Sequence, residues 1–355
     1  MSLYADIHKK LGEFSLDISF ETGREVKGIL GASGCGKSMT LKCIAGIVKP
    51  DSGRIVLNDR VLYDSEKRID LTPQQRRVGY LFQNYALFPG MTVEQNIGIG
   101  IRSLQSDAKK RKISEMLETF DLKELAKRYP GQLSGGQQQR TALARILAYE
   151  PEVLMLDEPF SALDTFLKEQ MHFEVQKMLK AYTGDVLMVT HSRDEVYRFC
   201  DSVVIMEKGR MVEQGNMREL FKHPETITTA KLSGCKNFSR AEKRGDHHLF
   251  AADWNVILRS ASPVPDNVRM VGIRAHEFIP EEKLPEENGF HLTVYDISEG
   301  PFEVSVRMTA EGNDPEDDSR LIWWKTESEQ WRKKYHETAP EFFRTDPSSV
   351  MPLTD

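Results

Sequence analysis

The sequence predicts an α/β domain followed by a smaller domain of β-strands. Before about residue 235, apolar runs of strand length alternate with helical patterns, which is typical of a buried and mostly parallel sheet. After that point, apolar residues recur at every second position, as they do on half-buried strands. The composition changes at the same place, because all four tryptophans lie beyond it. We therefore expect domains at 1–235 and 236–355.

Length, charge and cysteine content narrow the class of protein. A chain of 355 residues is long enough for two domains, and its net charge of -6 argues against a nucleic-acid partner, for which a basic surface is expected. No apolar run approaches the roughly 20 residues that cross a bilayer, and the first residues do not resemble a signal peptide. The four cysteines are scattered, which indicates reduced thiols: Cys35, Cys43, Cys200 and Cys235.

Three strand–helix units make up the first domain. Each begins with an apolar strand and continues into a helix: Val26–Leu30 with a helix from Lys37, Val153–Leu156 with a helix after Ser161, and Val186–Val189 with a helix after Ser192. The stretch 86–148 is different. Its apolar residues repeat at helical spacing, as in Ile113, Met116, Leu117 and Phe120, so we expect a helical insert there.

The second domain is predicted to be a small β-barrel, similar to an OB fold. Residues His291–Ile297 alternate, and the run Phe302, Val304, Val306 and Met308 alternates strictly after a turn at 299–301. Five acidic residues with Gly and Pro at 311–318 indicate a solvated loop.

A glycine-rich loop follows the first strand and opens a helix. It fits G-x-x-x-x-G-K-[ST] and reads Gly31, Ala32, Ser33, Gly34, Cys35, Gly36, Lys37 and Ser38, with Met39 next. The backbone N–H groups of such a loop surround phosphate oxygens. We expect Lys37 to contact the β- and γ-phosphates and the Ser38 hydroxyl to bind Mg²⁺. A chance match to this pattern is expected in only about one in a hundred chains of this length, and a Rossmann loop would need a third glycine, so we expect this loop to bind phosphate groups.

Polar residues end two further buried strands. Asp157 and Glu158 follow Val153–Leu156, and His191 follows Val186–Val189. On their own, Asp-Glu-Pro is more often a turn and a single histidine is usually structural. Beside a phosphate loop, we expect Asp157 to hold Mg²⁺, Glu158 to activate the attacking water and His191 to contact the γ-phosphate.

The segment LSGGQQQR at 133–140, followed by a helical run, completes a resemblance to the ATP-binding subunits of ABC transporters. The resemblance covers at least 1–235 and includes, in order, the P-loop, a glutamine loop at Gln83, this signature, the Asp157 strand, an aspartate loop at 161–164 and His191. It implies an ATPase domain with a helical subdomain, in which Gln83 joins the Mg²⁺ shell and Asp164 lies at a dimer seam. It also implies that Ser134, Gly135, Gly136 and Gln137 cover the γ-phosphate on a second copy, which gives a homodimer with two ATP molecules between its subunits.

The second domain resembles the regulatory domain of ABC importers, on the strand and turn Val271–Glu277. The resemblance, together with Lys10–Phe14, favours import of an oxyanion: molybdate or tungstate, or sulfate. Sugar, polyamine and iron importers are alternatives, and a soluble ABC ATPase that acts on nucleic acid or ribosomes is a further one. The implied partners are permease subunits and, indirectly, a substrate-binding protein, with the chain at the cytoplasmic face of the membrane.

Two features of the first domain allow more than one interpretation. The apolar segment 82–89 is either core or a groove for a permease helix, with Tyr85, Leu87 and Phe88 as its walls. In this family an aromatic residue before the P-loop stacks on adenine. Tyr4, Phe14 and Phe20 are candidates; Phe20 ends an alternating strand and fits a core position, while Leu11 or Phe14 fits a weaker apolar contact.

Overall fold

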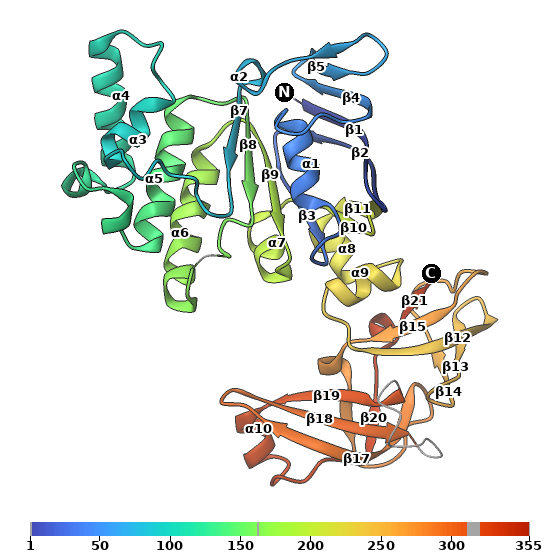
Figure 1. Cartoon of the computed structure of the whole chain (residues 1–355). Coiled ribbons are helices and arrows are strands. Elements are labelled where there is room, and N and C mark those ends of the chain that lie inside the picture. The colour runs from blue at the N-terminus through green and yellow to red at the C-terminus, as the bar shows by residue number, and fades with distance from the viewer. Residues whose placement is uncertain (1, 162, 311–319, 355) are drawn as a thin grey trace. The chain divides into compact units, whose positions relative to one another are not determined.

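A computed structural model describes residues 2–161, 163–310 and 320–354 (Figure 1). The chain forms two compact units, Met1–Arg218 and Glu219–Asp355. Helix α8 (Met217–Lys222) straddles this division. The domain boundary expected at 235 therefore stays a prediction, and each unit is described below by itself.

The first unit is built around one large sheet. In the described part of the chain it has eleven strands in the order β6-β5-β4-β1-β2-β11-β10-β3-β9-β8-β7. The strands are β1 (Ser2–Leu11), β2 (Phe14–Gly23), β3 (Val26–Gly31), β4 (Ser52–Leu57), β5 (Arg60–Asp64), β6 (Ile69–Asp70), β7 (Val78–Leu81), β8 (Val153–Asp157), β9 (Asp185–Thr190), β10 (Ser202–Glu207) and β11 (Arg210–Asn216).

The half of the sheet from β10 to β7 is parallel, as the sequence predicted. Strand β3 pairs in parallel with β10 and β9, and β8 pairs in parallel with β9 and β7. Every residue of β8 and β9 is buried, which explains their continuous apolar runs. Because the strands are parallel, the carboxyl ends of β3, β8 and β9 lie at the same edge of the sheet.

The other half is antiparallel, except where β2 pairs in parallel with β11, and its strands alternate between buried and exposed residues. In β2, Leu16, Ile18 and Phe20 are buried, so the core position expected for Phe20 is confirmed. Their side chains join those of β1 and β4 in the main core of the unit.

Helices flank the parallel strands and form a separate group beyond β7, where the helical insert was predicted (Figure 1). They are α1 (Lys37–Ile44), α2 (Pro73–Arg76), α3 (Val93–Ile99), α4 (Ser106–Thr119), α5 (Gly135–Ala148), α6 (Thr165–Ala181) and α7 (Arg193–Phe199). Helices α3, α4 and α5 share a small core that includes Ile97, Met116, Leu117 and Ala144. The insert is therefore a helical subdomain with its own apolar contacts.

In its described residues, the second unit contains two antiparallel sheets with a common core. One has the order β14-β13-β12-β15-β21 and the other β16-β20-β17-β18-β19. Their elements, with two helices, are α9 (Ile227–Leu232), β12 (Asn237–Gly245), β13 (His248–Ala251), β14 (Val256–Arg259), β15 (Met270–Ile273), β16 (Ile279–Glu281), β17 (Gly289–Glu299), β18 (Glu303–Ala310), β19 (Ile322–Glu327), α10 (Ser328–Lys333), β20 (Phe342–Arg344) and β21 (Met351–Leu353). Trp254, Trp324 and Trp331 are buried in the shared core. The β-rich fold is confirmed, whereas the closed barrel stays a prediction.

The predicted alternation is wrong at three positions. On β17, Val294 is 38% and Ile297 39% exposed, although the alternation expects both to be buried. Val304, Val306 and Met308 are buried on β18, but Phe302 is 85% exposed and precedes the strand. The Gly300 N–H donates to the Glu303 carbonyl across the turn, so Phe302 lies in the turn rather than in the sheet. The acidic stretch 311–318 lies outside the described residues.

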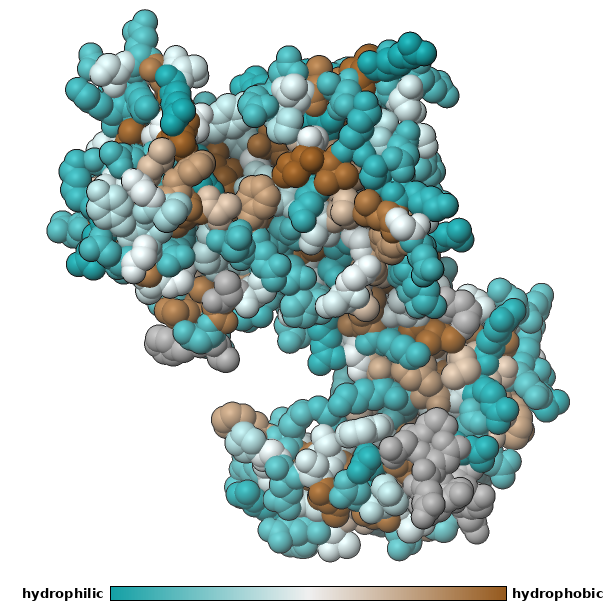
Figure 2. Space-filling model, viewed as in Figure 1, coloured by the Kyte–Doolittle hydropathy of each residue, from teal (hydrophilic) through white to brown (hydrophobic). Residues whose placement is uncertain are grey.

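No helix in the described residues is long and apolar enough to cross a membrane. The face of the molecule in Figure 2 is mainly hydrophilic, with apolar side chains scattered among polar ones.

Candidate active site at the strand ends

The glycine-rich loop joins β3 to α1 in a conformation that its glycines require. Gly34 has φ 81° and Gly36, the residue before α1, has φ 107°. Residues with a Cβ rarely adopt such angles. A Cβ on Gly36 would also lie 2.9 Å from the Leu16 side chain. The loop therefore turns tightly into the helix, and the N–H groups of the first turn of α1 remain without helical partners.

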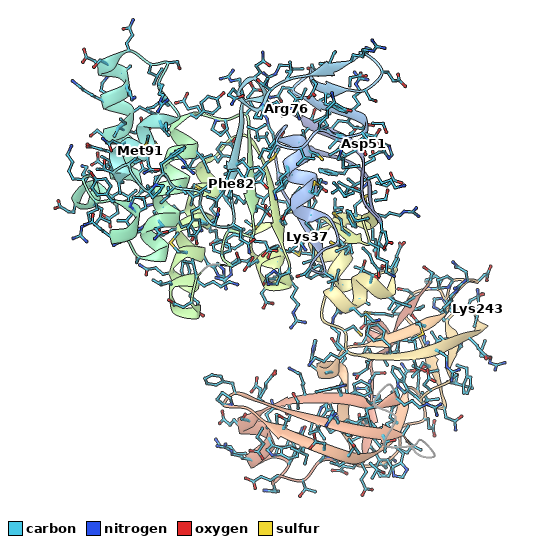
Figure 3. All side chains as sticks on the ribbon, in the orientation of Figure 1. Lys37, Asp51, Arg76, Phe82, Met91 and Lys243 are labelled. Atoms are coloured by element: carbon cyan, nitrogen blue, oxygen red, sulfur yellow. The ribbon has the colours of Figure 1, made fainter. Side chains whose placement is uncertain are left out.

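Lys37 is buried inside this loop (Figure 3). Its Nζ donates to the carbonyl oxygens of Gly31 at 2.8 Å and Ala32 at 2.9 Å. The far end of α1 is held by Arg76, whose guanidinium donates to the carbonyls of Cys43 and Ile44. A cation at a helix C-terminus is stabilising, so α1 is supported at both ends.

Asp157 ends β8 and lies beside the start of α1. The Ser38 hydroxyl donates to Oδ1 of Asp157 at 2.6 Å, and the Tyr80 hydroxyl donates to Oδ2 at 2.7 Å. Hydroxyl and carboxylate oxygens are ligands that Mg²⁺ prefers, so the residues present fit this ion. Ser38 and Asp157 are brought together as expected, whereas Tyr80 was not anticipated.

Two of the expected site residues, His191 and Gln83, converge on a carboxylate oxygen of a third, Glu158. Oε2 of Glu158 lies 3.4 Å from Nδ1 of His191 and 3.5 Å from Nε2 of Gln83. Glu158 has a positive φ of 46°, an uncommon conformation for a residue with a side chain and one that is often found at functional sites. Gln83 contacts Glu158 in this group. Among the described residues, no hydrogen bond joins Gln83 to Ser38 or Asp157.

The signature segment lies at the start of α5. Ser134 Oγ accepts a hydrogen bond from the Gln137 N–H, and Gln137 Oε1 accepts one from the Ser134 N–H. This reciprocal pair forms a capping box, which fixes the helix start and leaves the neighbouring N–H groups of Gly135 and Gly136 at its end. In the sheet order, β7, β8 and β9 separate the helical subdomain from β3 and its loop. No hydrogen bond or ion pair recorded for the described residues joins the signature to the P-loop of the same chain.

Asp164 caps the next helix, because its side chain accepts a hydrogen bond from the Leu167 N–H at the start of α6. It is exposed. Ala162, also in the aspartate loop, lies outside the described residues.

Among the residues considered for adenine stacking, Phe14 lies beside the loop. Its ring carbon Cζ is 3.0 Å from the position that a Cβ on Gly36 would occupy. Phe20 is buried in the core and Leu11 is 40% exposed at the end of β1. Of these side chains, Phe14 therefore provides the apolar surface beside the P-loop.

Two residues that support the site were not anticipated from the sequence. Arg145 of α5 donates to the carbonyls of Ala86 at 2.7 Å and Tyr85 at 2.9 Å, and thus joins the signature helix to the segment after Gln83. Glu195 is buried; it accepts a hydrogen bond from Thr190 at 2.6 Å and pairs with Lys168 at 2.5 Å, which joins the β9 end to α6. An Arg or Glu on a helix looks the same in the sequence whether its side chain makes such contacts or faces solvent.

Comparison with known families gives a direct result. Residues 15–161 match the family described as ABC transporter. A probable sulfate/thiosulfate import ATP-binding protein of Chlorella vulgaris is 38% identical over 240 residues, which are 66% of this chain and 99% of the relative. The chain belongs to the ABC transporter family. It is an ATP-binding and ATP-hydrolysing subunit, with the P-loop α/β fold of that family.

Other relatives have related names. A molybdate/tungstate import ATP-binding protein of Thermococcus kodakarensis is 40% identical over 278 residues, which are 77% of this chain and 81% of the relative. An Fe(3+) ions import ATP-binding protein of Haemophilus influenzae is 42% identical over 221 residues, and the match covers 61% of this chain and 62% of the relative.

Two solved structures have a fold similar to part of this chain. The dimeric ATP-binding cassette MJ0796 bound to ADP and Pi matches with a TM-score of 0.52 and 26% identity. The match covers 61% of this chain and 99% of the MJ0796 chain. CbiO1 of Clostridium perfringens, part of an ABC transporter complex, has a TM-score of 0.55 and 30% identity over 62% of this chain and 90% of its own.

Proposed function

We propose that this ABC ATPase subunit powers the import of an oxyanion, molybdate or tungstate or else sulfate, through a membrane permease. The observation that carries the proposal is the arrangement at the ends of β3, β8 and β9. There the P-loop, the Ser38–Asp157 pair and the group of Gln83, Glu158 and His191 meet at one edge of the sheet. That arrangement supplies phosphate binding, a metal position and a base for water within one site.

The phosphates of ATP bind along residues 31–39, where the loop and the start of α1 present their N–H groups. Lys37 exchanges its two carbonyl acceptors for phosphate oxygens, which are charged and so bind the ammonium more strongly. Phe14 packs against the adenine side of the nucleotide. The contact of its ring with the loop at Gly36 supports this position.

Ser38 and Asp157 would hold Mg²⁺, and the amide oxygen of Gln83 would be a further ligand. When bound, the ion neutralises charge on the phosphates and fixes their position. Glu158 accepts a proton from the attacking water, while His191 and Gln83 orient the carboxylate and the γ-phosphate.

A second copy completes each site. The capped start of α5, with Ser134, Gly135, Gly136 and Gln137, is a helix N-terminus suited to an anion. Within one chain it makes no recorded contact with the P-loop in the described residues. The likeness to a dimeric cassette bound to ADP and Pi supports an arrangement in which it covers the γ-phosphate of the partner, with Asp164 at the seam.

The permease docks on the helical subdomain. A groove of about 720 Å³ lies between α3 and α4 and is lined by Met91, Gln95, Ile99, Ile113 and Leu117, among others. It suits the apolar face of a short helix. The residues expected as walls do not line this groove: Tyr85 is buried and fits the core alternative, Leu87 is half-buried and Phe88 is exposed. Such docking places the chain at the cytoplasmic face of the membrane, with a substrate-binding protein as an indirect partner.

The names of the relatives favour an oxyanion over iron as cargo, because a sulfate/thiosulfate and a molybdate/tungstate import protein are both among them. The molybdate/tungstate relative matches over 278 residues, more than the first unit contains, so that similarity extends into the second unit. We propose that the second unit is the regulatory domain, with an OB-like barrel, and that it contributes to cargo sensing.

Two measurements on the full chain test this proposal. We expect phosphate release from ATP that depends on Mg²⁺, and heat of binding in calorimetry with molybdate, tungstate or sulfate. Mg²⁺-independent or absent phosphate release would contradict the assigned site. Binding of ferric ion without any oxyanion binding would favour the iron alternative.

A further inference from the structure

Both oxygens of the Asp157 carboxylate are held by hydroxyl groups that come from different elements. Ser38 on α1 donates to Oδ1 at 2.6 Å and Tyr80 on β7 donates to Oδ2 at 2.7 Å. Asp157 is 5% exposed, so water has little access to either oxygen. The orientation of this carboxylate is therefore set by the two hydroxyls.

The sheet itself places Tyr80 at this position. Strand β7 pairs in parallel with β8, and Tyr80 lies opposite Met155, two residues before Asp157. The Tyr80 ring packs at 4.5 Å from the ring of Phe82, which joins the main core. Burial raises the pKa of the Tyr80 phenol, with the Asp157 charge as a further cause, so the hydroxyl is protonated and donates.

A fixed carboxylate matters for a metal site because Mg²⁺ demands near-ideal geometry. The Ser38 oxygen donates its proton to Asp157 and keeps its lone pairs free for the ion. If Oδ2 lost its donor, the carboxylate would rotate more freely, and that rotation would have to be frozen whenever the metal bound. Partners that orient a ligand in this way typically contribute about 10-fold or more to metal affinity.

We propose that Tyr80 is a positioning residue for the Mg²⁺ site, which it serves by fixing the Asp157 carboxylate through its hydroxyl. The inference rests on the proposed role of Asp157 in holding the metal. Because the chain runs from the end of β7 through Phe82 to Gln83, the same hydroxyl ties this carboxylate to the segment that carries Gln83.

The test is Tyr80→Phe in the full chain, with the chain saturated with ADP and titrated with Mn²⁺ as a paramagnetic substitute for Mg²⁺. Free Mn²⁺ is followed by electron paramagnetic resonance, and ADP affinity is measured separately in EDTA. We expect the half-saturating Mn²⁺ concentration to rise about 10-fold, with ADP affinity in EDTA unchanged. The matched control is Tyr63→Phe, since Tyr63 is also buried and its hydroxyl donates to the Pro50 carbonyl at 2.9 Å. This control should bind Mn²⁺ like the wild type.

Equal Mn²⁺ affinity in the wild type and Tyr80→Phe would overturn the role of Tyr80. The role would also be overturned if Tyr80→Phe lowered ADP affinity in EDTA by the same factor as it lowered Mn²⁺ affinity, since that result indicates a structural role only. Tyr80→Met provides a second variant without the hydroxyl, and unfolding of both variants in thermal melts would also show a structural role. If the wild type bound ADP equally with and without Mn²⁺, the metal site itself would be refuted, and with it the proposed function.

Discussion

Replacing Glu158 with glutamine keeps the shape of the side chain and removes its negative charge. Oε2 of Glu158 is the atom on which His191, at 3.4 Å, and Gln83, at 3.5 Å, converge. The variant retains the polar contacts but can no longer accept a proton from water. Loss of a positioned base lowers the rate about 100-fold or more, which corresponds to about 2.7 kcal/mol in the activation free energy.

Binding of ATP should survive this substitution, because the contacts of the P-loop and of Ser38 with Asp157 do not involve Glu158. The assay is phosphate release at saturating Mg²⁺ and ATP, together with equilibrium binding of a fluorescent ATP analogue. Glu152→Gln is a matched control, since Glu152 is similarly buried and pairs with Arg60 and Arg77 at the opposite end of β8. It should hydrolyse ATP at the wild-type rate.

A Glu158→Gln variant that hydrolysed ATP as fast as the wild type would refute the role given to Glu158. A variant that lost ATP binding to the same extent as activity would refute the separation between the P-loop and the water-activating group. The first result would require another base at the strand ends.

Three further predictions concern other residues of the first unit. Phe14→Ala should raise the KM for ATP up to about 10-fold with little change in kcat, as measured by steady-state kinetics, because it removes an aromatic contact beside the loop; an unchanged KM would exclude Phe14 from the adenine site. Arg145→Met should lower the free energy of unfolding by about 1–3 kcal/mol in urea, because two carbonyls lose a charged donor; a difference below about 0.5 kcal/mol would contradict this. Burial, and after it the charge of Arg198, lowers the pKa of His172 below its ordinary value of 6.5. The unfolded chain therefore binds a proton at this residue more readily than the folded chain, and the free energy of unfolding should fall as pH drops below about 6.5. His172→Phe should remove up to about 1.4 kcal/mol of that loss per pH unit in urea titrations, and parallel pH profiles for the two chains would contradict the assignment.

The parts of the site that depend on local backbone requirements were predictable from the sequence. The P-loop needs glycine at Gly34 and Gly36 because of their positive φ values, and such requirements leave a fixed pattern in the chain. Asp157 and His191 were predictable because parallel strands end at one edge of a sheet, so residues that follow buried strands meet there.

The contacts missed by sequence reasoning depend on register and side-chain reach between distant segments. Tyr80 is an aromatic residue in a short strand, and its hydroxyl meets Asp157 only because β7 and β8 pair in the observed register. Nothing near Arg145 in the sequence indicates that it reaches the carbonyls beyond Gln83.

The error at Phe302 has the opposite cause, since a local pattern was extended too far. The alternation of β18 was carried back to Phe302 across a turn, where the strand has not yet begun. Segment 82–89 was left open between core and groove, and its buried Tyr85 fits the core alternative.

The central claim of this account is that one chain holds an incomplete ATP site and that a second copy completes it through the signature helix. Sedimentation of Glu158→Gln with saturating ATP and Mg²⁺ tests the claim most directly, because slow hydrolysis keeps the bound state populated. The account predicts a monomer without nucleotide and a dimer with ATP, reversed when Ser134 is changed to a large residue such as arginine at the start of α5. A chain that stays monomeric at saturating ATP would contradict it.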